Sequence, residues 1–153
     1  MLNRLTTNLA FASALALTAA ATGCADDPAE GFVGDWTYSA GEFRVDCGGQ
    51  QMLVPLDTTL VETIALGDSA DLSKSDSIGC LGVTFDVSGR VASLSPSPQS
   101  CEVPGMGTST ADHYTLTLSS DGMTLTAASS GTLLITGAPA ACTFTGGGTL
   151  IRP

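Results

Sequence analysis

The side chains of this 153-residue chain that could do chemistry are five cysteines, one histidine and scattered carboxylates. The histidine, His113, follows Asp112, and an Asp–His pair can orient a general base. No serine stands out as its nucleophile, and the chain has no G-x-S-x-G elbow. We therefore predict that the chain has no catalytic residues and is not an enzyme. A hydrolase of the cell envelope is the distant alternative.

Carboxylates gather in one acidic segment, residues 57–76, but their spacing is irregular. They are Asp57, Glu62, Asp68, Asp71 and Asp76. A calcium loop needs a regular D-x-D-x-D-G spacing, and zinc sites are built from closely spaced cysteine and histidine pairs. The chain has neither, and Gly146-Gly147-Gly148 is not followed by the Lys of a phosphate loop. We predict no metal and no cofactor. The acidic segment should be a solvated face, while Glu62, set in an apolar strand, faces solvent or a polar cavity.

Composition excludes two further classes of protein. The formal net charge is −10 with only five Lys and Arg, so no basic surface exists for nucleic acid. Outside the N-terminus no apolar run reaches the roughly 18 residues of a membrane-spanning helix, which excludes a polytopic helical membrane protein.

Residues 1–23 have the three parts of an export signal. Arg4 gives a positive start, residues 9–17 are apolar, and small residues lead up to Cys24. Ala21-Thr22-Gly23-Cys24 resembles the lipobox of bacterial lipoproteins, which implies that Cys24 carries lipid and anchors the chain to a membrane. The odd cysteine count favours this, since an exported protein rarely keeps a free thiol.

The residue after Cys24 is Ala25 rather than Asp, which by the same resemblance implies the outer membrane rather than retention at the inner one. The alternative is ordinary cleavage near Ala19-Ala20-Ala21, which would give a secreted or periplasmic soluble protein with Cys24 spare. Residues 24–31 are acidic and contain Pro28, and we read them as a flexible tether.

Residues 32–153 form about 120 residues, which is enough for a single domain. Apolar and polar residues alternate with period two, and turn residues recur every 8 to 12 positions, as in an all-β sandwich or barrel. We expect about eight to ten antiparallel strands in a meander. Closure into a barrel removes the exposed edges of such a sheet, so a closed barrel is favoured over a β-sandwich. Gly146-Gly147-Gly148 would mark a bend or bulge in the last strand.

The hairpins are expected at five turn signals. These lie at Ala40-Gly41, near Gly67-Asp68, at Ser88-Gly89, at Asp121-Gly122 and near Gly137 to Ala140. The Asp121-Gly122 turn sets Leu118 opposite Leu125. The Ser88-Gly89 turn sets Phe85 opposite Ala92.

Four cysteines remain if Cys24 is lipidated, and in an oxidising compartment they should form disulfides. Four cysteines allow three pairings. We favour Cys80 with Cys101, which flank one hairpin, and Cys47 with Cys142, which join early and late strands.

Gly34-Asp35-Trp36 at the start of the first expected strand resembles the Gly-x-Trp motif of the lipocalin and wider calycin barrels. The resemblance implies that Trp36 closes one barrel end beside a basic residue of the last strand, for which Arg152 is the candidate. The chain as a whole also resembles uncharacterised small bacterial lipoproteins with Ser/Thr/Gly-rich β domains and paired cysteines. That likeness bears on localisation and fold only.

We thus expect a lipid-anchored barrel of the cell envelope that binds a small apolar ligand or a protein partner. The alternative is a structural or interaction lipoprotein whose core is filled. An eight-stranded barrel is either filled by side chains or holds one ligand, so a cavity separates these two possibilities.

Overall fold

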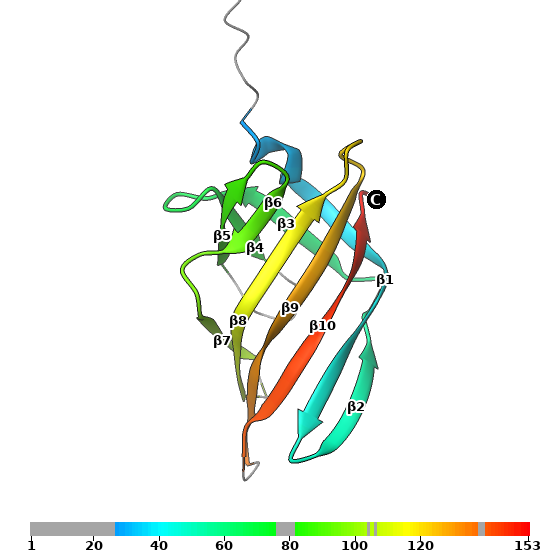
Figure 1. The fold of residues 1–153 in the computed structure, drawn as a ribbon, viewed down its shortest axis with the longest axis vertical. Helices are drawn as coiled ribbons and strands as arrows, with labels where there is room; N and C mark the ends of the chain where they lie inside the picture. Colours follow the sequence, from blue (N-terminus) through cyan, green and yellow to red (C-terminus); the bar gives the residue numbers. More distant parts are fainter. Residues whose placement is uncertain (1–26, 76–81, 104, 106, 138–139) are drawn as a thin grey trace, which may run out of the picture.

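The computed structural model describes residues 27–75, 82–103, 105, 107–137 and 140–153 (Figure 1). The expected signal 1–23 and Cys24 lie outside the described residues. A short 3-10 helix, η1, precedes ten strands. The elements are η1 (Glu30–Phe32), β1 (Gly34–Cys47), β2 (Gln50–Pro55), β3 (Val61–Leu66), β4 (Leu72–Ser75), β5 (Val83–Ser88), β6 (Val91–Leu94), β7 (Gln99–Val103), β8 (Gly107–Leu118), β9 (Thr124–Ile135) and β10 (Cys142–Ile151).

Eight of these strands form a closed antiparallel barrel, in the order β1, β3, β4, β5, β6, β8, β9 and β10. β10 pairs back onto β1, which closes the eight-stranded barrel, while β2 and β7 each pair on one side only. The all-β class and the closed barrel predicted from the sequence are therefore confirmed.

The barrel has a closed end and an open end because β1 and β8 change partners along their length. The first residues of β1 pair with β3, whereas residues 42–47 pair with β2. β8 likewise pairs with β6 near its end and with β7 over residues 107–111. All eight strands surround the closed end near η1. Only the long strands β1, β8, β9 and β10 run on to the open end, with β2 and β7 at their flanks (Figure 1).

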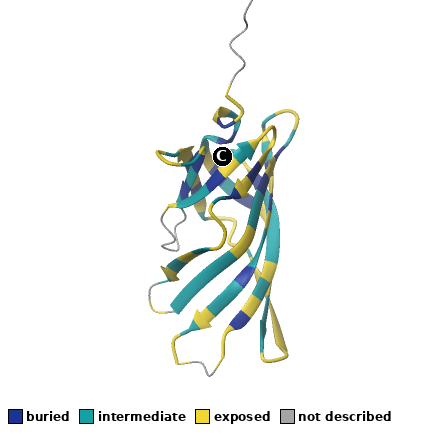
Figure 2. Cartoon of the chain, turned by 60° about the vertical axis from the view of Figure 1, so that its left-hand side comes forward, coloured by how far each residue is buried: buried dark blue, intermediate teal, exposed yellow. Residues whose placement is uncertain are grey.

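The hydrophobic core fills the closed end. Its fully buried large side chains are Phe32, Trp36, Ile64, Leu72, Phe85, Leu116, Leu125 and Leu150. They occupy alternate positions of their strands, as the period-two pattern predicts. Figure 2 shows that buried residues gather at this end and thin out along the long strands.

The β8–β9 hairpin has the register expected from its turn, with Leu118 opposite Leu125. The loop is wider than a two-residue turn. The N–H of Ser119 donates to the carbonyl of Thr124, and Gly122 adopts a φ of 71°. The apolar face predicted for this hairpin is buried.

The register expected for the β5–β6 hairpin is wrong by two residues. Phe85 lies opposite Leu94, not Ala92, and Ser88 lies opposite Val91. The turn is therefore Gly89-Arg90, with Gly89 first at a φ of 60°, the position that favours glycine in a two-residue turn. A shift of two keeps each side chain on its face, so alternation alone does not detect it.

The turn expected at Ala40-Gly41 is also wrong, because β1 continues through it with a bulge between Tyr38 and Ala40. Gly41 instead permits a close approach of strands: a Cβ there would lie 2.6 Å from the carbonyl oxygen of Gly147. The predicted bulge in β10 is absent. Residues 146–148 pair without interruption with both β1 and β9.

The disulfide between Cys47 and Cys142 is confirmed, and it ties the end of β1 to the start of β10 at the open end. Cys101 is also disulfide-bonded. Cys80, its predicted partner, lies outside the described residues.

The folded part begins earlier than residue 32. Ala29 and Phe32 are buried and η1 packs against the closed end, so residues 29–31, expected as part of the tether, belong to the folded domain. Residues 24–26 lie outside the described residues. The described part of the chain contains no helix of the length and apolarity needed to cross a bilayer.

Candidate functional site

A cavity of about 500 Å³ occupies the open half of the barrel. This volume falls within the range of small-molecule pockets, roughly 300–1,000 Å³. Most of its lining is apolar. The main apolar side chains are Phe43, Val45, Met52, Val54, Leu56, Leu60, Val83, Val103, Leu133, Ile135 and Phe144.

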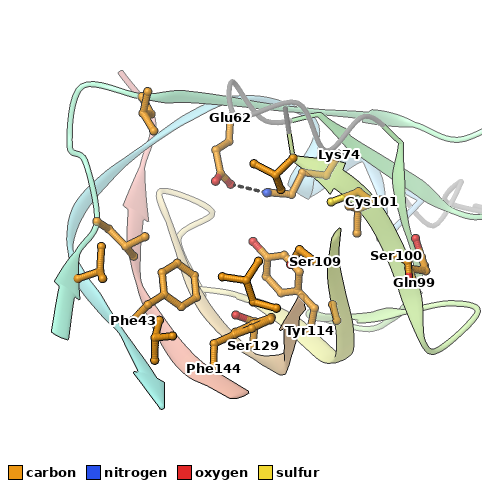
Figure 3. A pocket seen from close by; sticks show the side chains of 18 of the residues that line it. Phe43, Glu62, Lys74, Gln99, Ser100, Cys101, Ser109, Tyr114, Ser129 and Phe144 are labelled. Carbon is orange, nitrogen blue, oxygen red and sulfur yellow. Dashed lines mark ion pairs between the residues drawn. The ribbon is translucent and has the colours of Figure 1, made fainter. Parts of the chain in front are cut away.

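The cavity exists because small side chains occupy the inward positions of β8 and β9 at this level. Ser109, Ala111 and Ser129 line it where the closed end carries leucine, phenylalanine and tryptophan. Figure 3 shows Ser109 and Ser129 facing the same space as Phe43 and Phe144. The binding hypothesis required that the interior not be filled throughout, and this half is hollow.

Several apolar side chains of the cavity remain exposed to solvent. Met52 and Val54 of β2 keep 52% and 46% of their surface accessible. Phe43 and Phe144 meet edge to face with ring centroids 6.0 Å apart, which makes a firm aromatic wall between β1 and β10. An apolar molecule in the cavity would remove this exposed surface from water.

A buried ion pair forms the inner, polar end of the cavity. Glu62 of β3 and Lys74 of β4 point into it from adjacent strands, and their side chains are only 9% and 4% exposed (Figure 3). Lys74 Nζ lies 2.9 Å from Glu62 Oε2. The two opposite charges are therefore in direct contact, away from bulk solvent.

Two tyrosines complete this polar end. Tyr38 and Tyr114 share a side-chain hydrogen bond, and Lys74 Nζ lies 5.2 Å from the centre of the Tyr114 ring. Burial raises the pKa of Tyr38 above its ordinary value, and the neighbouring Tyr114 and Glu62 raise it further. The Tyr38 phenol therefore stays protonated and serves as a hydrogen-bond donor. Tyr114 also packs edge to face on Phe85, which links the polar end to the core.

The Gly-x-Trp residues lie at the opposite, closed end. Arg152 Cζ sits 4.4 Å from the centre of the Trp36 ring. Its guanidinium donates to the carbonyls of Gly31, Val33 and Gly122 at 2.9, 3.1 and 3.3 Å. A Cβ on Gly34 would lie 2.8 Å from Arg152 Nη1, which explains glycine at that position.

The other residues singled out in the sequence are dispersed. His113 is exposed on the outer side of β8. In the acidic segment, Asp57, Asp68 and Asp71 are exposed, whereas Glu62 is buried and lines the cavity, one of the two positions expected for it. Asp57 lies at the cavity lining, where the hydroxyl and N–H of Thr59 donate to it and hold the pKa of its carboxyl below the ordinary value. The described residues hold no group of three His, Cys, Asp or Glu side chains placed for a metal.

Comparison of the chain with protein-family models, curated proteins and solved structures found no match. The function of the cavity is therefore inferred from its geometry and chemistry alone.

Sequence reasoning missed Lys74 and the two tyrosines as members of one site with Glu62. The available signal was a pair of opposite charges at inward positions of neighbouring strands, in segments that are otherwise apolar on that face. Only Glu62 was singled out.

Proposed function

We propose that this barrel binds a small apolar molecule in its open half. The proposal rests on the cavity, which has a volume of about 500 Å³, is lined mainly by apolar side chains and is closed at one end by the packed core. Burial of apolar surface contributes roughly 25 cal/mol per Å², so a ligand that covers the exposed walls gains affinity from that alone.

Binding can be tested by titrating N-phenyl-1-naphthylamine, an apolar dye whose emission rises in apolar surroundings, into the purified protein. Ser129→Phe should fill the cavity from β9 and weaken dye binding at least about tenfold, an effect of about 1.4 kcal/mol. Ala128→Phe is the matched control, because Ala128 is exposed on the other face of the same strand. Equal loss in both variants, or no binding by the wild type, would contradict the proposal.

Native mass spectrometry of protein purified from its own source gives an independent test. A co-purifying small molecule that is present in the wild type and absent from Ser129→Phe would support the cavity as its site. A wild-type spectrum of the bare chain, together with no dye binding, would favour the filled structural lipoprotein instead.

We propose further that the chain is exported and anchored through lipid on Cys24. Asp27, the first described residue, leads into η1 at the closed end. Three residues span at most about 11 Å, so an anchor on Cys24 would hold the closed end close to the membrane. The cavity would then open away from the bilayer. Cys24→Ser should release the protein from membranes, and continued membrane association of that variant would refute the anchor.

A further inference from the structure

The polar end of the cavity has no net charge of its own. Glu62 and Lys74 carry opposite charges, and both are more than nine-tenths buried. Next to the pair, the described residues offer a third charge no free partner of opposite sign, so burying such a charge there is unfavourable. The pair therefore discriminates against charged head groups of either sign.

The two side chains nevertheless offer hydrogen bonds in both directions. An ammonium group only donates, and an ionised carboxylate only accepts. The Glu62 carboxylate lines the cavity and has acceptor sites beyond its one contact with Lys74 Nζ, so it can accept a further hydrogen bond. A group that complements the pair must carry a hydrogen-bond donor and an acceptor within one small functional group, and it must be neutral. A hydroxyl or a primary amide meets both conditions.

The surroundings of the pair agree with such a head group. The phenol groups of Tyr38 and Tyr114 line the cavity beside the pair. Figure 3 shows Tyr114 close to the pair, with the apolar rings of Phe43 and Phe144 beyond it. A molecule with a polar head against the pair would lay its apolar tail along those walls toward the open end.

We propose that the cavity selects a neutral amphiphile with a hydroxyl or primary-amide head, which donates to the Glu62 carboxylate and accepts from Lys74 Nζ. This inference rests on the proposed binding function and names the class of ligand. It excludes ionised fatty acids and alkyl amines as preferred ligands, although their tails would fit the same walls.

Three ligands with the same ten-carbon tail and different heads test the selection. Decan-1-ol, decanoate and decylammonium are titrated at neutral pH against the protein loaded with N-phenyl-1-naphthylamine. Decan-1-ol should displace the dye at about tenfold lower concentration than either ion, because each ion would bring an unpaired charge against a pair that is already neutral. Equal displacement by all three, or better displacement by an ion, would overturn the selection.

Two matched variants reverse the selection in opposite directions. In Glu62→Gln the charge of Lys74 is unpaired, so decanoate should gain about tenfold while decylammonium does not. In Lys74→Gln the carboxylate of Glu62 is unpaired, so decylammonium should gain instead. If both variants fold and the three ligands displace the dye in the same order as in the wild type, the role of the ion pair is overturned.

The outcomes separate the two proposals. If the dye does not bind the wild type, the binding function itself fails. If the dye binds and the three heads compete equally, the cavity binds apolar molecules and only the head-group selection fails. The wild-type series decides the selection even where a variant does not fold, which the emission of the buried Trp36 would reveal.

Discussion

Arg152 should be a principal stabiliser of the closed end, because one side chain joins three separate segments. It connects the carbonyls of Gly31 and Val33, near η1, with that of Gly122 in the β8–β9 loop. It also covers the ring of Trp36. Arg152→Met removes all of these contacts while keeping a side chain that fills part of the space.

The expected loss follows from the contacts. A hydrogen bond to a charged group contributes about 1.5–3 kcal/mol when buried, and we take about 1 kcal/mol for each here because Arg152 is half-buried. The cation–π contact adds about 0.5–1 kcal/mol. Arg152→Met should therefore lower the free energy of unfolding by about 3–4 kcal/mol, a large part of the total of about 5–15 kcal/mol for a small domain.

Arg152→Lys should lie between the wild type and Arg152→Met. A lysine keeps a positive charge near Trp36, but one ammonium group does not reach the carbonyls of Gly31 and Val33 at η1 together with that of Gly122 in the β8–β9 loop. We expect a loss of about 1–2 kcal/mol for this variant. Arg90→Met is the control, because Arg90 is exposed in the β5–β6 turn and its side chain should contribute less than about 0.5 kcal/mol.

The assay is urea unfolding followed by tryptophan fluorescence. Trp36 is the sole tryptophan and is fully buried, so its emission reports directly on the closed end. A loss of unfolding free energy below about 1 kcal/mol in Arg152→Met, or one no larger than in Arg90→Met, would refute the role of Arg152 as a principal stabiliser of the closed end.

Three further perturbations follow from the same structure. Lys74→Met leaves the Glu62 carboxylate buried and unpaired, so it should lower the free energy of unfolding in urea by about 3–5 kcal/mol. The double variant Lys74→Met with Glu62→Leu should be nearly as stable as the wild type. Equal losses of stability in the single and the double variant would contradict this. Replacing Cys47 and Cys142 by alanine removes a disulfide that joins residues 95 positions apart, and it should lower the free energy of unfolding by about 2–5 kcal/mol. A loss below about 1 kcal/mol would contradict this prediction. The Ser119 hydroxyl and the Met123 N–H donate to Asp121 and hold the pKa of its carboxyl below the ordinary 3.8. The ionised Asp121 therefore stabilises the fold above pH 3.8, and this stabilisation is lost as the pH falls through the lower pKa of the folded state. Asp121→Asn should flatten the acid limb of the stability curve below about pH 4, and an unchanged limb would contradict this.

The strand faces were predictable because they depend on local alternation. The β8–β9 hairpin shows this: its Asp-Gly turn and its alternating leucines and threonines sufficed for the correct register. The β5–β6 hairpin shows the limit. Two registers that differ by two residues place Phe85 on the same face, so the pattern did not distinguish them.

Glycine was the main source of error, since it serves both turns and close strand contacts. At Gly89 it opens a turn, whereas at Gly41 it lets β1 pass close to the backbone of Gly147. The sequence around Gly41 does not contain the information that separates these uses, because the partner lies more than 100 positions away in the chain.

The candidate site was predictable only in outline. Glu62 was expected to face solvent or a polar cavity, and it faces a cavity. The cavity depends on two changes of pairing partner along the long strands: β1 pairs first with β3 and then with β2, and β8 pairs with β7 and then with β6. These changes divide the barrel into a closed end and an open end. These exchanges are choices among long-range pairings with similar local patterns.

By itself, then, the sequence determined the all-β class and the inward and outward faces of the strands, because both follow from residue type and alternation. It favoured Cys47 with Cys142 among three possible pairings, and the structure decided for that pair. The tertiary structure alone decided which inward side chains of different strands lie at the same level of the barrel. It brought Glu62 beside Lys74, and it set small side chains at one level of the open half, because barrel closure aligns strands whose separation along the chain carries no local signal.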